Sequence, residues 1–146
     1  MDKQVCVGFN KGSYHNQTIT IETPRNVKII SKNTKFVVAL LEHFIKNNFE
    51  ELKPFDRIKQ VGFWRYLIVR ESERLGQTLI TVVVKTEGVN EGILKAVKEE
   101  LAEYMKKSVR GLVGLCWLSY NGEADSVPSE KPELLYGQPF YQEKIF

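Results

Sequence analysis

The sequence of 146 residues predicts an α+β fold, in which two helices cover one face of an antiparallel sheet. Two observations support this prediction. Several short stretches are rich in β-branched and aromatic residues, which is typical of strands, and two longer stretches carry apolar residues at helical spacing. They follow one another as strand, helix, strand, strand, helix, strand, with an extra hairpin expected at each end.

The composition is that of a single globular domain spanning residues 1–146. Apolar residues make up 42% and charged residues 27% of the chain. No apolar run approaches the roughly 20 residues of a membrane span, and the first residues lack the apolar core of a signal peptide. The two cysteines, Cys6 and Cys116, lie in apolar strand-like contexts without disulfide spacing. We therefore expect no membrane association and a reducing intracellular compartment, either cytoplasm or nucleus.

The first elements are a hairpin and a helix. Residues 4–9 and 18–21 predict two strands, separated by a polar, turn-rich loop. Asn33 or Thr34 is expected to cap a helix that runs to about residue 47. The helix has one apolar stripe, formed by Val37, Leu40, Leu41, Phe44 and Ile45.

A central hairpin and a second helix follow. Residues 62–71 and 78–84 predict strands joined by a polar loop that contains a glycine. Asn90 is expected to cap a helix from residue 91 to about residue 107. Its buried stripe is formed by Ile93, Leu94, Val97, Leu101, Tyr104 and Met105.

The last part of the chain predicts a strand over residues 112–120, a polar loop over residues 121–132, and a final hairpin from residues 134–137 and 140–141. The six central elements match the βαββαβ order of ferredoxin-like sheets. Two helices can cover only one face of such a sheet. Both faces of the strand over residues 62–71 are nevertheless apolar, so we expect the second face to be covered as well.

Motifs for catalysis and metal binding are missing from the sequence. Neither a Cys/His cluster nor a phosphate-binding glycine loop is present, and no nucleophile elbow is found. The sequence therefore assigns no catalytic residue, no metal ligand and no cofactor site within these residues.

Charge is distributed unevenly. Residues 1–35 carry six basic and two acidic residues, a net +4, whereas residues 111–146 carry two basic and five acidic residues, a net −3. This asymmetry indicates a polyanion at one end. Candidate RNA-binding residues lie in the first loop and in the central hairpin: Lys11, Tyr14, His15, Trp64, Arg65, Arg70 and Arg74.

Strand alternation limits how these residues can act together. Arg65 and Arg70 are five positions apart, so they are expected on opposite faces of the sheet, with Trp64 on the face of Arg70. Only one of the two arginines could then share a face with a ligand. Trp64 suits either the core or base stacking, and the core is favoured, because the aromatic platform of an RNA-recognition domain is absent.

A set of short motifs is spread along the chain in a fixed order: Val7-Gly8-Phe9, Lys11-Gly12-Ser13, Gly62-Phe63-Trp64-Arg65, Leu67, Val69-Arg70, Pro128-Ser129-Glu130, Leu135-Tyr136-Gly137 and Glu143-Lys144-Ile145. In these motifs and their order the chain resembles the central domain of the RNA uracil-5-methyltransferases. It is most similar to the eukaryotic tRNA (uracil-5-)-methyltransferases.

The resemblance implies an enzyme that depends on S-adenosylmethionine and methylates C5 of a uridine in tRNA. In the family, a cysteine thiolate attacks the flipped-out base from a catalytic domain that follows the central one. Neither Cys6 nor Cys116 matches that nucleophile's motif. Residues 1–146 are thus expected to be a monomeric fragment that is inactive alone, with tRNA and a catalytic domain in cis as partners. The alternative is a stand-alone ferredoxin-like module for protein interaction or dimerisation.

Overall fold

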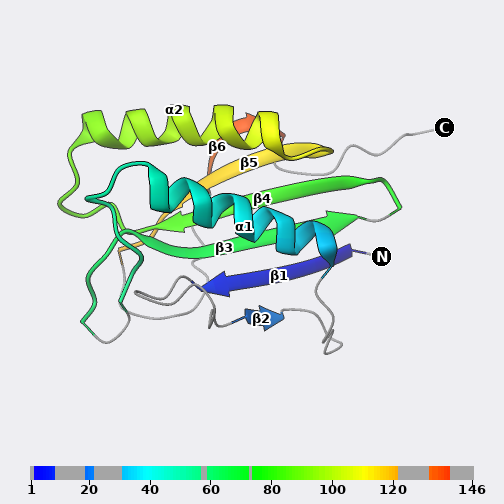
Figure 1. The fold of residues 1–146 in the computed structure, drawn as a ribbon, viewed down its shortest axis with the longest axis horizontal. Coiled ribbons are helices and arrows are strands. Elements are labelled where there is room, and N and C mark those ends of the chain that lie inside the picture. Colours follow the sequence, from blue (N-terminus) through cyan, green and yellow to red (C-terminus); the bar gives the residue numbers. More distant parts are fainter. Residues whose placement is uncertain are drawn as a thin grey trace.

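The computed structural model describes residues 2–8, 19–21, 31–56, 59–72, 74–121 and 132–138, the first two ranges by their backbone. One mixed sheet holds six strands in the order β2-β1-β3-β4-β5-β6, and two helices lie against it (Figure 1). Within these ranges, no helix is both long and apolar enough to cross a bilayer. The elements are β1 (Asp2–Gly8), β2 (Ile19–Ile21), α1 (Lys32–Asn47), β3 (Trp64–Ser72), β4 (Gln77–Val84), α2 (Glu91–Ser108), β5 (Leu112–Ser119) and β6 (Glu133–Gly137).

Two helical crossovers build the sheet. Strand β1 pairs antiparallel with both β2 and β3, so β2 and β3 are parallel to each other. Helix α1 connects these two strands across β1, which makes a split βαβ unit. Helix α2 connects β4 to β5, which are parallel and directly adjacent. The remaining pairs, β3 with β4 and β5 with β6, are antiparallel.

The α+β class and the opening hairpin are confirmed, but the expected antiparallel, ferredoxin-like sheet is wrong in its strand order. The four strands of the expected core, β1, β3, β4 and β5, follow the sheet in chain order. The reason is that β2, predicted as an addition, leads into α1 and places β1 between itself and β3. At the other end, β6 is confirmed as a strand, whereas the expected partner at residues 140–141 lies outside the described residues.

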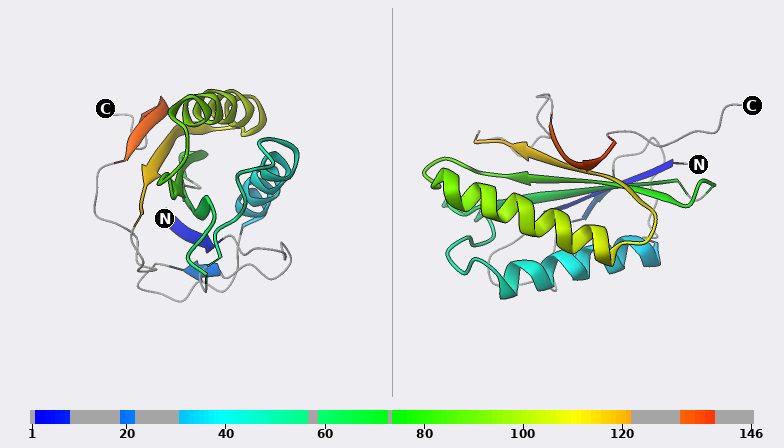
Figure 2. Two further views of the ribbon diagram at one scale, coloured as in Figure 1. Left: turned by 90° about the vertical axis from the view of Figure 1, so that its left-hand side faces the viewer. Right: turned by 90° about the horizontal axis from the view of Figure 1, so that it is seen from above.

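Both helices pack on the same face of the sheet (Figure 2). The buried stripes of α1 and α2 meet β3, β4 and β5 in one apolar core, and Tyr104 donates a hydrogen bond of 2.9 Å to the carbonyl oxygen of Leu40. Burial raises the pKa of the Tyr104 phenol. At the centre of the core, the ring of Trp64 makes edge-on contacts with Phe63, Phe44 and Trp117 at centroid distances of 4.9, 6.2 and 6.4 Å.

A β-bulge at Arg65 changes which residues of β3 share a face. Trp64 is paired with Val84, and Tyr66 is paired with the adjacent Val83, so Arg65 is the extra residue. Trp64 therefore lies on the helix face with Leu67 and Val69. The predicted alternation, which placed Trp64 on the face of Arg70, is wrong because the bulge shifts the pattern by one residue.

The helix starts agree only partly with the predicted caps. Asn90 caps α2 as expected and accepts a 2.7 Å hydrogen bond from the backbone N–H of Gly92. Helix α1 is capped by Ser31, two to three residues before the predicted caps, because its hydroxyl accepts from the backbone N–H of Thr34. Asn33 and Thr34, the expected caps, use their side chains for a tertiary contact instead.

Removal of the α2 cap has a small expected effect. Asn90→Ala should lower the free energy of unfolding by about 1 kcal/mol, because the first turn loses an acceptor. Asn90→Asp retains the acceptor and should stay close to the wild-type stability. Urea denaturation measures both variants. Equal stability of Asn90→Ala and Asn90→Asp would contradict the capping role.

Candidate nucleic-acid interface

The residues predicted to bind RNA fall into two groups. Lys11, Tyr14 and His15 lie outside the described residues. Trp64, Arg65 and Arg70 belong to β3, and Arg74 lies in the hairpin that follows it. Of these four residues, Trp64 and Arg65 are buried, Arg70 is half-buried and Arg74 is exposed.

Trp64 is a core residue. Its side chain is 0% exposed, so a nucleic-acid base has no access to its ring. Its indole Nε1 is buried, and no hydrogen-bond partner for it is found among the described residues. The neighbouring groups are aromatic rings, whose faces accept N–H donors only weakly. Packing, and not base stacking, is therefore the role that the structure gives to Trp64.

Arg65 is also buried, with 2% of its surface exposed. Its guanidinium carbon lies 4.2 Å from the ring centroid of Phe55 and 4.7 Å from that of Tyr120. The same guanidinium donates a 3.0 Å hydrogen bond to the backbone carbonyl of Tyr120. The bulge thus directs Arg65 between two aromatic rings, where cation–π contacts hold the segment before β3 to the end of β5.

The sheet face opposite the helices carries a second, smaller apolar cluster. Ile68, Val83 and Leu118 are buried there, and Tyr66 and Tyr120 pack against them partly exposed. The three aliphatic side chains are already withdrawn from solvent in the single chain. Consequently this face does not offer an open platform of stacked aromatic rings.

Cys116 is buried on β5. Burial raises the pKa of its thiol, and a hydrogen bond with Thr81 opposes that shift. A raised pKa lowers the thiolate fraction at a given pH, and the thiolate is the reactive form. Cys116 is therefore unsuited to nucleophilic catalysis in this conformation.

Thiol labelling tests the state of Cys116. In a Cys6→Ser variant, Cys116 is the single thiol of the chain, since the sequence has two cysteines. At pH 8 we expect labelling by a thiol reagent at least about 100-fold slower in the native protein than in urea, because the thiol is buried and protonated. Similar rates in the two states would contradict this expectation.

Glu71, at the end of β3, is a buried carboxylate that binds the start of α1. It accepts hydrogen bonds from the hydroxyls of Ser31 and Thr34, and from the amide of Asn33 at 3.0 Å. The Asn33 amide also donates to the hydroxyl of Thr78 at 2.9 Å. Charge-assisted hydrogen bonds of this kind fix geometry strongly. The network fastens α1 to β3 and β4. No local sequence pattern predicts it, because Glu71 is about 40 residues away from its partners.

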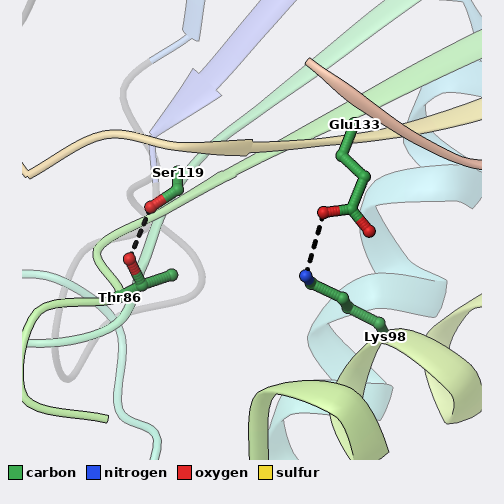
Figure 3. A network of polar contacts seen from close by, with 4 residues as sticks. All are labelled: Thr86, Lys98, Ser119 and Glu133. Atoms are coloured by element: carbon green, nitrogen blue, oxygen red, sulfur yellow. Dashed lines mark hydrogen bonds and ion pairs between the residues drawn. The ribbon is translucent and has the colours of Figure 1, made fainter. Parts of the chain in front are cut away.

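Other polar contacts also connect elements of the fold (Figure 3). Thr86 and Ser119 share a hydrogen bond between their hydroxyls, and Lys98 forms a 3.0 Å ion pair with Glu133. The latter pair borders a groove of about 630 Å³ between α2 and β6, whose charged residues are of both signs. Over the described ranges, no three His, Cys, Asp or Glu side chains gather as a metal site. These contacts form no catalytic constellation.

Two known proteins are similar to this chain, although no family model matches it. A zinc finger CCCH domain-containing protein of Arabidopsis thaliana is 25% identical over 145 residues, which cover 86% of this chain. An RNA methyltransferase of Caldanaerobacter subterraneus is 30% identical over 114 residues, which cover 77% of this chain. The chain spans only 18% and 23% of the lengths of these two relatives. It is therefore similar to one part of an RNA methyltransferase.

Proposed function

We propose that the chain is a non-catalytic domain of an S-adenosylmethionine-dependent tRNA uracil-5-methyltransferase, which positions RNA against a catalytic domain. The observation that carries the proposal is the similarity to an RNA methyltransferase, which takes in 77% of this chain and 23% of the relative. Such coverage is expected of one module in a multidomain enzyme. The proposed target, C5 of uracil, is inferred from the sequence motifs that resemble the central domain of the uracil-5-methyltransferases.

The described side chains support a positioning role over a catalytic one. The buried carboxylate of Glu71 and the buried thiol of Cys116 are both engaged by the fold. A catalytic domain in cis would bring the nucleophilic thiolate and S-adenosylmethionine as the methyl donor. The contribution of this chain would be a rigid sheet, held at one end by Arg65 and at the other by Glu71.

The plant relative fits the same proposal. A CCCH finger needs three cysteines and one histidine, whereas this chain has two cysteines in total. This chain therefore cannot form such a finger by itself. A module common to a zinc finger protein and a methyltransferase is consistent with a domain that accompanies other functional domains.

Binding of tRNA tests the proposal directly. The 146-residue chain is titrated into a fluorescent, unmodified tRNA transcript at about 25 mM salt. We expect a micromolar dissociation constant that rises steeply with salt, because binding depends on phosphate contacts. A duplex DNA of similar length is the control. Absence of binding to tRNA at low salt would overturn the RNA-positioning role.

The alternative function, a module that dimerises through the face opposite the helices, is disfavoured by burial. Ile68, Val83 and Leu118 already have little exposed surface in the single chain, so a second copy would gain little apolar burial there. Sedimentation of the chain as a monomer is expected. A stable dimer that dissociates when Tyr66 and Tyr120 are replaced by serine would favour the alternative.

A further inference from the structure

We propose that the RNA backbone is contacted at one end of the sheet, by a surface called here the basic end. It lies where α1 begins, where β3 turns into β4, and where α2 turns into β5, at the right of Figure 1. This inference rests on the proposed RNA-positioning function and gives it a location. The basic end carries six exposed cations, Lys32, Lys35, Arg74, Lys106, Lys107 and Arg110.

Direct contacts place the three elements side by side. The start of α1 is joined to β3 and β4 through the hydrogen bonds of Glu71 and Asn33. The turn before β5 lies against the hairpin, because the backbone N–H of Thr78 donates to the carbonyl of Gly111 at 2.9 Å. A Cβ atom at Gly111 would lie 2.4 Å from the carbonyl oxygen of Gly76. The cations therefore belong to one continuous surface.

Positive charge at the basic end is poorly compensated by the acidic side chains that the structure describes. Glu71 is buried in its hydrogen-bond network, and Glu103 lies 3.8 Å from Lys107. The opposite end of the sheet is mixed, since four lysines are interspersed with five acids there. These residues are Lys46, Lys53, Lys59 and Lys85, with Glu50, Glu51, Asp56, Glu87 and Glu91. Even with Asp2, whose backbone pairs with Ser72 at the basic end, the cations there outnumber the acids, and such an excess attracts a polyanion.

Stability does not explain the lysines of α1. The first turn of α1 has no acidic residue, and Lys32 and Lys35 add positive charge to the positive end of the helix dipole. Helix α2 has the favourable arrangement, with Glu91 in its first turn and Lys106 and Lys107 in its last. A locally unfavourable charge pattern that is absent from the other helix indicates a functional cause.

Phe36 adds an aromatic contact to this surface. Its side chain is 50% exposed, although Val37, the next residue along α1, is fully buried. It lies one helical turn after Lys32, and Lys35 lies three positions after Lys32. The exposed side chains of Lys35 and Phe36 therefore both neighbour that of Lys32 at the helix start. An exposed ring flanked by cations suits an unpaired base stacked on the ring and its phosphates bound by the lysines. The chemical class of the ligand is thus an RNA loop and its flanking backbone.

A charge-matched pair of variants tests the cationic part. The variant Lys32→Ala/Lys35→Ala/Arg74→Ala/Arg110→Ala removes four cations from the basic end. The control, Lys46→Ala/Lys53→Ala/Lys59→Ala/Lys95→Ala, removes four exposed cations elsewhere. We expect the first variant to bind a tRNA transcript about 100-fold more weakly, with the salt slope lowered by about 3, and the control to change affinity by less than about 5-fold.

The aromatic part is tested with Phe36→Ala and Phe36→Trp. We expect Phe36→Ala to weaken binding of an RNA hairpin about 10-fold without changing the salt slope, and Phe36→Trp to bind like wild type. A blunt RNA duplex should not distinguish the three proteins. Circular dichroism and urea denaturation verify that every variant is folded.

The outcomes separate this inference from the proposed function. If the wild-type chain does not bind tRNA, the RNA-positioning function fails. If the wild type binds and the two charge variants lose equal affinity, only the location is wrong. Equal hairpin binding by Phe36→Ala and wild type would overturn the stacking contact.

Discussion

Trp64→Ala is expected to lower the free energy of unfolding by about 4 kcal/mol. The ring is fully buried, and its edge-on contacts with Phe63, Phe44 and Trp117 join β3 to α1 and β5. Its removal loses the transfer free energy of a large apolar group and leaves a cavity that close packing fills only in part. Urea denaturation at 25 °C measures the loss.

Trp64→Phe provides the matched comparison. It keeps an aromatic ring and should lose about 2 kcal/mol, roughly half the effect of alanine. The tRNA affinity of the folded fraction should remain close to that of wild type in both variants, because the ring is inaccessible. Unchanged stability together with lost tRNA binding would contradict the core role and restore Trp64 as a ligand contact.

Short-range features of the fold were accessible from the sequence, and long-range ones were not. The apolar stripe of α2, its cap at Asn90 and the β3–β4 hairpin follow from periodicity and capping chemistry, and the structure confirms them. The order of strands depends on which strands pair, and β1 inserts between β2 and β3. Alternation patterns do not show which strands pair. The predicted helices and core strands are therefore present, whereas the ferredoxin-like strand order is wrong.

The bulge at Arg65 shows a second limit of sequence analysis. A period of two residues assigns faces correctly only along an uninterrupted strand. Beyond the bulge, Tyr66 packs with Ile68 on the face opposite the helices, and Trp64 remains with the core. The charge of Arg65 predicts an RNA-binding residue, whereas its burial between aromatic rings depends on segments distant in the sequence.

Of the six cations of the basic end, the sequence predicts only Arg74 as an RNA-binding residue. Sequence patterns do not indicate Lys32 and Lys35, because their proximity to Arg74 depends on the hydrogen bonds of Glu71. Phe36 did leave a signal, since it is an aromatic residue outside the apolar stripe of its helix. Apolar residues that fall off an otherwise regular stripe therefore indicate exposed contact positions.

Glu71→Ala is expected to lower the free energy of unfolding by about 3 kcal/mol. The carboxylate is 7% exposed and accepts from Ser31, Thr34 and Asn33, so its loss leaves several donors without their acceptor. Thr34 is itself buried, which prevents water from replacing the lost oxygen easily. A double-mutant cycle with Thr34→Val, followed by urea denaturation, measures the coupling, which we expect to exceed about 1 kcal/mol.

Glu71→Ala also shows whether tRNA affinity depends on the position of α1 or only on the net charge of the chain. Glu71→Ala removes a negative charge, which by electrostatics alone should strengthen tRNA binding. If Glu71 holds the first turn of α1 against the hairpin, the turn frays and Lys32, Lys35 and Phe36 lose their fixed position, so binding should weaken about 5-fold instead. Glu71→Gln removes the same charge but keeps an oxygen that accepts from Ser31 and Thr34, and it should bind tRNA at least as tightly as wild type. Stronger binding by both variants would show that charge dominates and that the position of α1 does not matter.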